Sequence, residues 1–574
     1  MIKPAKCAFS FFAAALLSIS TAHAASGNSA DLLSYVPADT PYIFAATKPL
    51  PSKMADKLEP TIDEILQAYQ RILRHVMAEQ LVKMSAEEEG ADEAEKFRGV
   101  AEEVLALMSL DGIRGAGIAR ESAFAFYGNG LLPVLRFELS KTELFDAAIE
   151  RIEEKAGEGL LVGKASGESY KYIDADEIRL IVATLDEQAV ITVVPAKYDE
   201  AQIAEALGLK KPRTSLKKSN TLRSIGKEYG FSEQMIGFVN NKRIAEIFAG
   251  KATERDKELF AAISEPLPEL TETCSAEIME MAGIAPRIVF GYTDLSSEQA
   301  KSAMIIELRK DIASGLATVP AAVPGLGSDP GGFMSFGFGL NPLALREFYE
   351  ARLDAMEADP YECENFADLQ AGVAKGREAL NQPLPPVLYS FRGFVANITD
   401  IQGMDMASNT PPDSIDASIL IAIENAEALV MLAALMDPQI AALNLLPDGK
   451  PVKLEMAQLA EIADLAFAAL SKDALSVSVG VDAETKSAAM LRAASPDKAP
   501  FMSMSMDSAR YYSMVGDAMA KQPSGDEENE LPMAIRTALA DVLALSGSMY
   551  ERMSVEIRFT SRGIEINGLM KLRD

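Results

Sequence analysis

The sequence predicts an α+β protein made of two tandem, duplicated lobes, each an antiparallel sheet covered by helices. Three observations favour this fold class. Alternating apolar segments are joined by hairpin-length turns, amphipathic segments follow several of them, and similar segments recur in the same order in both halves. Two lobes also fit the length, because 574 residues exceed the roughly 250–300 residues at which a single core stops growing.

The first 24 residues have the pattern of a signal peptide. Lys3 and Lys6 precede an apolar run at 8–19, and Ala22 and Ala24 occupy the two small-residue positions before a cleavage site. The run is shorter than the roughly 20 apolar residues that span a membrane. We therefore expect cleavage after Ala24 and a periplasmic or extracellular protein without a transmembrane segment.

The remaining chain divides at a stretch where proline and glycine are concentrated. The predicted segments are a signal peptide at 1–24, a first α+β lobe at 25–318, a linker at 319–332 and a second α+β lobe at 333–574.

Within each lobe, alternating apolar strands precede capped amphipathic helices. In the first lobe we expect strands at 133–140 and 235–240, helices at 141–153 and 242–249, and a hairpin of 178–184 with 189–194. In the second lobe we expect strands at 418–425 and 501–507, helices at 426–436 and 508–519, and a hairpin of 553–559 with 563–570.

The duplication is inferred from five pairs of similar segments. They are 42–50 with 334–343, 109–113 with 390–394, the strand ending at Ser140 with the strand ending at Asn425, the strand ending at Asn240 with the strand ending at Asp507, and 304–309 with 569–573. Their order is the same in both halves, as a repeat of whole domains requires.

The segment Leu32–Tyr42 reads Leu-Leu-Ser-Tyr-Val-Pro-Ala-Asp-Thr-Pro-Tyr. It resembles the start of a group of uncharacterised secreted bacterial proteins that are assigned to a domain of unknown function. The resemblance covers these residues and the general layout of the chain. It implies secretion and brings no catalytic or binding residue with it.

Charge and residue usage exclude several function classes. The formal net charge of −29 opposes binding to the phosphates of nucleic acids. Beyond the signal peptide the sequence has one histidine, His75, and two cysteines, Cys274 and Cys363. A zinc site takes three or four histidine or cysteine ligands. Phosphate-binding loops, nucleophile elbows and His-Glu-x-x-His motifs are absent from the sequence. We therefore assign no catalytic residue, no metal site and no cofactor.

One basic segment stands out in this acidic chain. Lys210, Lys211, Arg213, Lys217 and Lys218 are followed closely by two further cations, Arg223 and Lys227. The segment predicts a local anion-binding site for a phosphate-bearing headgroup, a polyanionic glycan or an acidic partner. The alternative is a solvated loop whose charges neutralise neighbouring carboxylates.

Methionines alternate with small polar residues at Met502, Met504 and Met506. This spacing places the three side chains on one face of a strand. Thioethers are soft ligands that suit Cu(I), but no histidine or cysteine stands beside them, so the sequence favours a packed core face.

Cys274 and Cys363 are expected to form a disulfide, because an even cysteine count in an oxidising compartment favours pairing. Such a bond would join the predicted lobes. The alternative is two separate thiols, and the polar residues around both cysteines do not indicate burial.

The function that the sequence favours is that of an exported, soluble, non-enzymatic envelope protein that binds a ligand or partner protein of unknown identity at or near the junction of the lobes, with an anionic ligand or another envelope protein as candidates. One alternative is a periplasmic hydrolase that uses carboxylates or a lone serine, for which Ser215 and Lys218 supply a Ser-x-x-Lys pattern without the Lys-Thr-Gly that accompanies it in penicillin-interacting enzymes. The other alternative is a structural or assembly factor without a small ligand.

Overall fold

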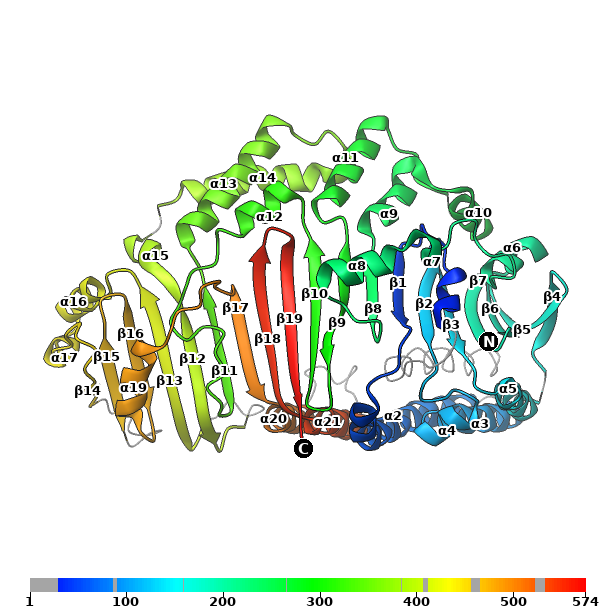
Figure 1. The fold of residues 1–574 in the computed structure, drawn as a ribbon, viewed down its shortest axis with the longest axis horizontal. Helices are drawn as coiled ribbons and strands as arrows, with labels where there is room; N and C mark the ends of the chain where they lie inside the picture. Colours follow the sequence, from blue (N-terminus) through cyan, green and yellow to red (C-terminus); the bar gives the residue numbers. More distant parts are fainter. Residues whose placement is uncertain are drawn as a thin grey trace. The chain divides into compact units, whose positions relative to one another are not determined.

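The computed structural model describes residues 29–85, 90–157, 159–264, 266–383, 385–405, 411–455, 465–521 and 532–574 (Figure 1). The predicted signal peptide and its cleavage site lie outside these described residues. The chain forms two compact units, each assembled from segments that are discontinuous in sequence. The first unit comprises Met1–Thr271, Arg287–Ser302 and Pro523–Met549, and the second comprises Glu272–Pro286, Ala303–Gln522 and Tyr550–Asp574.

The expected pair of lobes with separate sheets is wrong, although the α+β class holds. The strands of the described residues, nineteen in number, belong to a single sheet. An alternating apolar pattern specifies that a segment is a strand and which of its faces is buried. The pattern does not specify where a sheet ends, so it could not distinguish two sheets from one.

In the first unit, neighbouring strands pair in the order β4, β5, β6, β7, β3, β2, β1, β8 and β9. Their bounds are β1 Tyr42–Ala46, β2 Phe124–Asn129, β3 Leu132–Glu138, β4 Leu161–Ala165, β5 Glu168–Ala175, β6 Ile178–Leu185, β7 Gln188–Pro195, β8 Ile236–Val239 and β9 Ile288–Leu295, and β10 Gln299–Glu307 pairs with β9. Every pair of neighbours in this order, from β4 to β9, is antiparallel.

The helices of the first unit are α2 Ser52–Ser85, α3 Gly90–Ala106, α4 Leu110–Gly115, α5 Thr142–Ala156, α6 Glu200–Ala206, α7 Leu216–Ser219, α8 Thr221–Tyr229, α9 Asn241–Glu246, α10 Glu254–Ala262 and α21 Met533–Ser548. A 3₁₀ turn, η1 Ser29–Ser34, precedes β1, and a π turn, η2 Ile247–Lys251, follows α9.

The main core of the first unit lies between its sheet and helices α2, α3, α4 and α5. Helix α5 carries Phe145, Ile149 and Ile152 at the spacing of a single helical face, and all three are buried. They pack in one cluster with Phe137 of β3 and Val104 of α3. The amphipathic pattern of α5 therefore places the helix on the sheet.

In the second unit, neighbouring strands pair antiparallel in the order β14, β15, β16, β13, β12, β11, β17, β18 and β19. Their bounds are β11 Met334–Gly339, β12 Phe391–Gln402, β13 Ser414–Ile423, β14 Val452–Lys453, β15 Ala466–Leu470, β16 Ala474–Val479, β17 Met502–Asp507, β18 Tyr550–Thr560 and β19 Gly563–Leu572.

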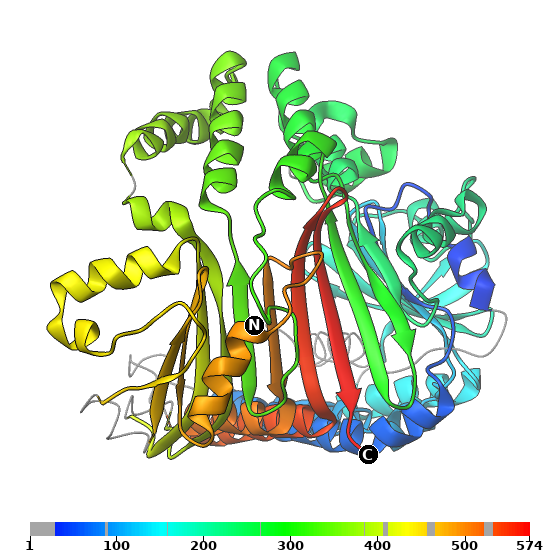
Figure 2. The same cartoon turned by 60° about the vertical axis from the view of Figure 1, so that its left-hand side comes forward.

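The helices of the second unit are α11 Glu272–Ile284, α12 Lys310–Leu316, α13 Pro342–Ala358, α14 Ala367–Asn381, α15 Pro386–Ser390, α16 Ala426–Met436, α17 Pro438–Ala442, α19 Ala483–Arg492 and α20 Ser508–Lys521, with a 3₁₀ turn η3 at Glu364–Phe366. Helix α19 lies along β13, β15 and β16 (Figure 2). Its Met490 packs in a buried cluster with Leu420 of β13 and with Val323 and Leu326.

The segment expected to be a linker, 319–332, is packed into the second unit. Val319, Val323 and Leu326 within it are at most 3% exposed. Its Asp329 accepts a hydrogen bond from the Arg552 guanidinium of β18 at 2.6 Å. The proline and glycine content therefore marks irregular backbone here rather than an exposed tether.

Most of the elements expected from local patterns are present. The predicted helix at 426–436 coincides with α16, and the predicted strand and helix at 501–519 correspond to β17 and α20. The two predicted hairpins are β6 with β7 and β18 with β19. One pairing of similar segments is wrong, because 109–113 lies in α4 whereas 390–394 begins β12.

In the described residues, no helix is both long enough and apolar enough to cross a membrane.

Candidate functional site

The five basic residues singled out in the sequence make different contacts. Lys210 makes an ion pair with Glu205 at 2.8 Å, and Lys211 places its ammonium 4.2 Å from the centre of the Tyr35 ring. The Lys218 ammonium donates to the carbonyl of Arg213 at 3.2 Å. Lys217 alone of the five lines the pocket described next.

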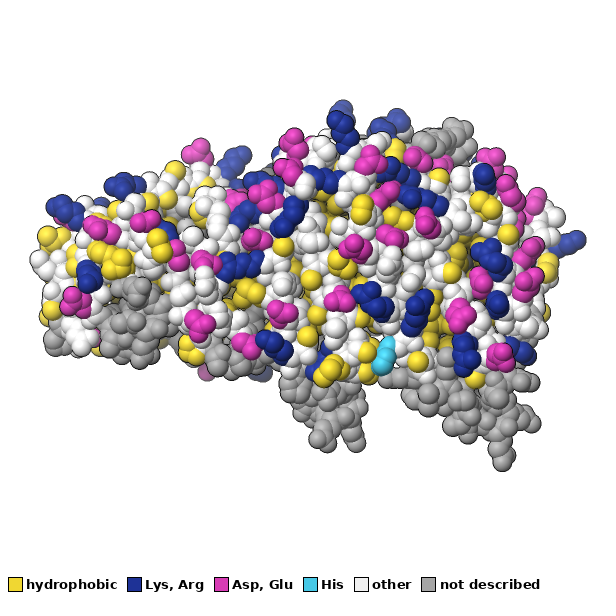
Figure 3. Space-filling view, turned by 90° about the horizontal axis from the view of Figure 1, so that it is seen from below, with side chains coloured by type: hydrophobic (Ala, Val, Ile, Leu, Met, Phe, Trp, Pro, Cys, Tyr) yellow, Lys and Arg dark blue, Asp and Glu magenta, His cyan; other side chains and the backbone are white. Residues whose placement is uncertain are grey.

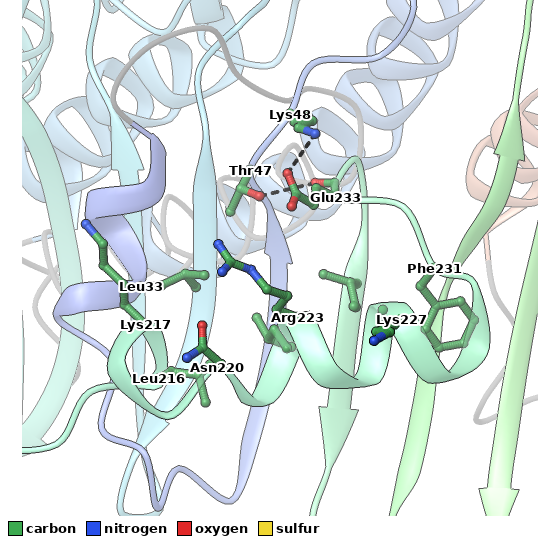
Figure 4. Close-up of a pocket in the computed structure, with 13 residues that line it drawn as sticks. Leu33, Thr47, Lys48, Leu216, Lys217, Asn220, Arg223, Lys227, Phe231 and Glu233 are labelled. Atoms are coloured by element: carbon green, nitrogen blue, oxygen red, sulfur yellow. Dashed lines mark hydrogen bonds and ion pairs between the residues drawn. The ribbon is translucent and has the colours of Figure 1, made fainter.

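This pocket lies in the first unit and has a volume of about 440 Å³ (Figure 4). It is formed by η1, the end of β1, α7, α8 and the loop that leads into β8. The lining residues are Leu33, Thr47, Lys48, Leu216, Lys217, Asn220, Leu222, Arg223, Gly226, Lys227, Phe231, Glu233 and Ile236. A volume of this size falls within the roughly 300–1,000 Å³ of small-molecule sites.

The short helix α7 is fixed at its N-terminal end. Ser215 is the N-cap residue, and its hydroxyl accepts a hydrogen bond from the backbone N–H of Lys218 at 3.3 Å. The Leu216 N–H donates to the carbonyl of Val36 at 2.8 Å, which ties α7 to the segment that follows η1. Ser215 is buried and serves as a cap, so its geometry gives no support to a serine nucleophile.

A left-handed residue separates α7 from α8. Asn220 has φ of 55°, a conformation that asparagine tolerates better than most residues. The turn redirects the chain so that Lys217 of α7 and Arg223 of α8 both line the pocket. In Figure 4 the Arg223 side chain extends from α8 toward the space between Leu33 and Thr47.

Helix α8 presents two cations on one face. Arg223 and Lys227 are four residues apart, so both lie on the side that faces the pocket. Gly226 lies between them, and a Cβ atom there would approach the Phe231 carbonyl to 3.2 Å. The glycine therefore lets α8 pack closely against the loop that closes the pocket.

The inner wall of the pocket is apolar. Leu216, Leu222, Phe231 and Ile236 are each at most 7% exposed. They come from α7, α8, the following loop and β8, and their burial fixes the wall without help from a ligand. The pocket thus combines a rigid apolar wall with a charged rim.

The rim is basic on balance. Lys48, Lys217, Arg223 and Lys227 face a single carboxylate, Glu233, so the lining carries a net charge of +3 in a protein of −29. Elsewhere, cations and carboxylates are interspersed, as the face in Figure 3 shows. The pocket is therefore a local departure from the acidic surface.

Glu233 has a structural partner at the rim. Its carboxylate pairs with the Lys48 ammonium at 2.9 Å, and its carbonyl accepts from the backbone N–H groups of Thr47 at 2.9 Å and Lys48 at 3.1 Å. In the part of the chain that the structure describes, Arg223 and Lys227 have neither a hydrogen-bond nor an ion-pair partner. These two cations are therefore available to an anion.

The two cysteines form a disulfide with an S–S distance of 2.10 Å. Both lie in the second unit, Cys274 on α11 and Cys363 just before η3, so the bond does not join two lobes as expected. Cys363 is 3% exposed, in contrast to its polar sequence context, and its N–H donates to the Glu277 carboxylate at 3.0 Å.

Sequence reasoning identified Lys217, Arg223 and Lys227 by their local charge density, but missed Lys48 and Glu233. These two residues lie on segments far apart in sequence and meet only because β1 and β8 are adjacent strands. No group of three or more histidine, cysteine, aspartate or glutamate side chains suited to a metal ion occurs among the described residues.

Comparison with known proteins finds no matching family model, no matching curated protein and no matching solved structure, so the pocket is interpreted from its own geometry.

Proposed function

We propose that this protein is an exported binding protein that takes an amphiphilic anion, with a carboxylate or phosphate head and an apolar chain, into the pocket of the first unit. The observation that carries the proposal is the position of Arg223 and Lys227, which have no partner in the described structure, above a buried apolar wall. An anion there would gain charge-assisted hydrogen bonds while its chain covers apolar surface.

The chemistry of the rim selects the head group. A guanidinium donates in a fork that matches a carboxylate or phosphate, and the nearby ammonium of Lys227 adds a second charge. The apolar wall disfavours a purely polar anion, since Leu216, Leu222 and Phe231 offer no hydrogen-bond partner to polar groups beyond the head. An uncharged chain of the same length would bind less well, because it leaves both cations unpaired.

The test is calorimetric titration of the full chain with decanoate and decyl phosphate, with decanol as the uncharged comparison. We expect the two anions to bind and decanol to bind at least about tenfold more weakly, the equivalent of roughly 1.4 kcal/mol. The double variant Arg223→Gln/Lys227→Gln should lose this preference. Lys210→Gln, a matched change at a basic residue outside the pocket, should keep it.

Binding that is equal for decanoate and decanol would overturn the proposal, as would an equal loss in the Lys210→Gln variant. A difference between decanoate and decyl phosphate would distinguish a fatty-acid-like ligand from a phosphate-bearing lipid. Because Arg223 and Lys227 are exposed, we expect both variants to fold as the parent does.

Export rests on the signal-peptide pattern at 1–24. Intact-mass measurement of the periplasmic protein should give a chain that begins within a residue or two of Ala25. A periplasmic protein that still carries Lys3 would contradict cleavage.

We also propose that the strand set arose by internal repetition, as the similar segments suggest. In support, β1 lies between β2 and β8 just as β11 lies between β12 and β17, and β3 pairs with β7 just as β13 pairs with β16. A superposition in which these strands fail to correspond in chain order would argue against the repeat.

A further inference from the structure

Four methionines lie side by side across four adjacent strands of the second unit. Met506 of β17 is the register partner of Met334 of β11 on one side and of Met553 of β18 on the other. Met553 is in turn the partner of Met570 of β19. Register partners in an antiparallel ladder project from the same face, so four thioethers share one face.

This row is not a consequence of composition alone. Methionine supplies 26 of the 574 residues, so four successive register partners of this type are not expected by chance. The row ends at Ile398 of β12, the partner of Met334. Met504, two residues before Met506, faces the same side and adds a fifth thioether next to the row.

Burial distinguishes Met506 from the other three methionines of the row. Met506 is 6% exposed, whereas Met334, Met553 and Met570 are half-buried. A group bound beside Met506 would therefore be largely shielded from water.

The spacing allows neighbouring sulfurs to converge. Side chains directly opposite one another in a sheet have Cβ atoms about 4.5–5.5 Å apart. Methionine has three rotatable bonds, so the sulfurs of Met334 and Met553 can turn toward that of Met506 without movement of the backbone.

We propose that Met334, Met506 and Met553 form a Cu(I) site, with Met504 or Met570 as a further ligand. Thioethers are soft donors, and among first-row metals they select Cu(I). The site lies in the second unit and is independent of the anion pocket, so either proposal can fail without the other.

The same donors exclude the harder metals. Zinc, calcium and magnesium require imidazole, thiolate or oxygen ligands, and three thioethers supply none of these. A row that served only to pack the sheet would show no metal preference, and the two readings therefore predict different outcomes of a metal titration.

The experiment is competition for Cu(I) between the protein and the chromophoric chelator bicinchoninate, with ascorbate as the reductant. The full chain carries Cys7→Ser throughout, because Cys7 is the one cysteine of the sequence outside the Cys274–Cys363 disulfide. Thiol titration before and after the assay verifies that the disulfide stays closed and supplies no thiolate ligand.

We expect one Cu(I) per chain and no Zn(II) binding. Met506→Leu and Met553→Leu should each weaken Cu(I) binding by at least the roughly tenfold that loss of an outer-shell partner costs a metal site. Met502→Leu is the matched control. Met502 lies on the same face of β17, but four residues at the usual rise of a strand place it about 13 Å from Met506. The Met502→Leu variant should therefore bind Cu(I) as the parent does.

Leucine is close to methionine in volume, so these variants should fold, and thermal unfolding of the metal-free proteins verifies this. The proposal is overturned if the parent binds no Cu(I) at one equivalent. It is also overturned if Met502→Leu weakens binding as much as Met506→Leu does, or if Zn(II) binds equally well.

Discussion

Arg243 and Asp256 form an ion pair in the first unit that is almost completely shielded from solvent. The guanidinium lies 2.6 Å from the carboxylate, and the side chains are 7% and 0% exposed. Burial acts to raise the pKa of Asp256, but hydrogen bonds from Arg243 and from Thr253 outweigh it, so the pKa lies below the ordinary value of 3.8. Thr253 and Asp256 also form the capping box of α10.

The first prediction concerns this pair. Asp256→Asn should lower the free energy of unfolding at pH 7 by about 3–5 kcal/mol, because it leaves the buried Arg243 charge with only the Asp39 carboxylate, at 3.9 Å. Since the folded pKa is depressed, the carboxylate contributes fully above its unfolded pKa of 3.8, and this contribution is lost as pH falls through the lower folded value. Denaturant unfolding from pH 7 to pH 2 measures both effects.

Glu254 on the same helix provides the control. Its ion pair with Lys257 is exposed on both sides, so Glu254→Gln should cost less than about 1 kcal/mol. Equal costs for the two substitutions would show that burial of the Arg243–Asp256 pair is not what stabilises α10.

Some of the pocket residues could be identified from the sequence and others could not. Lys217, Arg223 and Lys227 were identifiable because they are close in sequence and unusual in an acidic chain. The Lys210–Glu205 ion pair is local, because its partners are five residues apart, but the ion pair of Lys48 with Glu233 at the rim depends on a tertiary contact. The charge cluster in the sequence therefore pointed to the segment that forms one wall of the pocket, but it could not define the rest of the lining.

At the scale of elements, the disulfide is a cross-link between α11 and the segment before η3. It joins residues 89 apart in sequence within the second unit. Closing a loop of that length restricts the unfolded chain, and the chain-entropy model gives a stabilisation of about 4–5 kcal/mol.

The second prediction follows from this loop length. The double variant Cys274→Ser/Cys363→Ser should unfold at a clearly lower temperature than the parent, and addition of a reductant should lower the transition of the parent but not that of the variant. Cys7→Ser should leave the transition unchanged, since Cys7 lies outside the bond. If reductant shifts the parent and the double variant equally, the disulfide does not stabilise the second unit.

Local patterns predicted elements well because each pattern reflects forces within a few residues. The run 426–436 is a helix with the predicted ends because Asn425 adopts a left-handed conformation before it and Asp437-Pro438 follows it. The order of the strands in the sheet could not be predicted from local patterns. Partners such as β3 and β7 are separated in sequence by α5 and the three strands β4, β5 and β6, and the alternation of each strand fits many partners equally well.

At the scale of the whole molecule, the formal net charge of −29 repels other anions. On the proposed function, the positive charges at the pocket rim attract the anionic ligand against the repulsion from the net negative charge of the protein. Binding of an amphiphilic anion should therefore strengthen with added salt at first, as the repulsion is screened, and calorimetric titration at low and moderate ionic strength measures this trend. If affinity instead falls steadily from the lowest salt concentration upward, the positive charges of the pocket rim, and not the net negative charge of the protein, control association.

The most direct test of the central claim is photo-crosslinking with a decanoate that carries a diazirine in its chain. Mass mapping of the labelled protein should place the label on residues of the apolar wall, Leu216, Leu222 and Phe231, and labelling should fall sharply in the Arg223→Gln/Lys227→Gln variant but not in Lys210→Gln. Labelling that lies outside the pocket-lining segments 33–48 and 214–236, or that is unchanged in the double variant, would contradict the account.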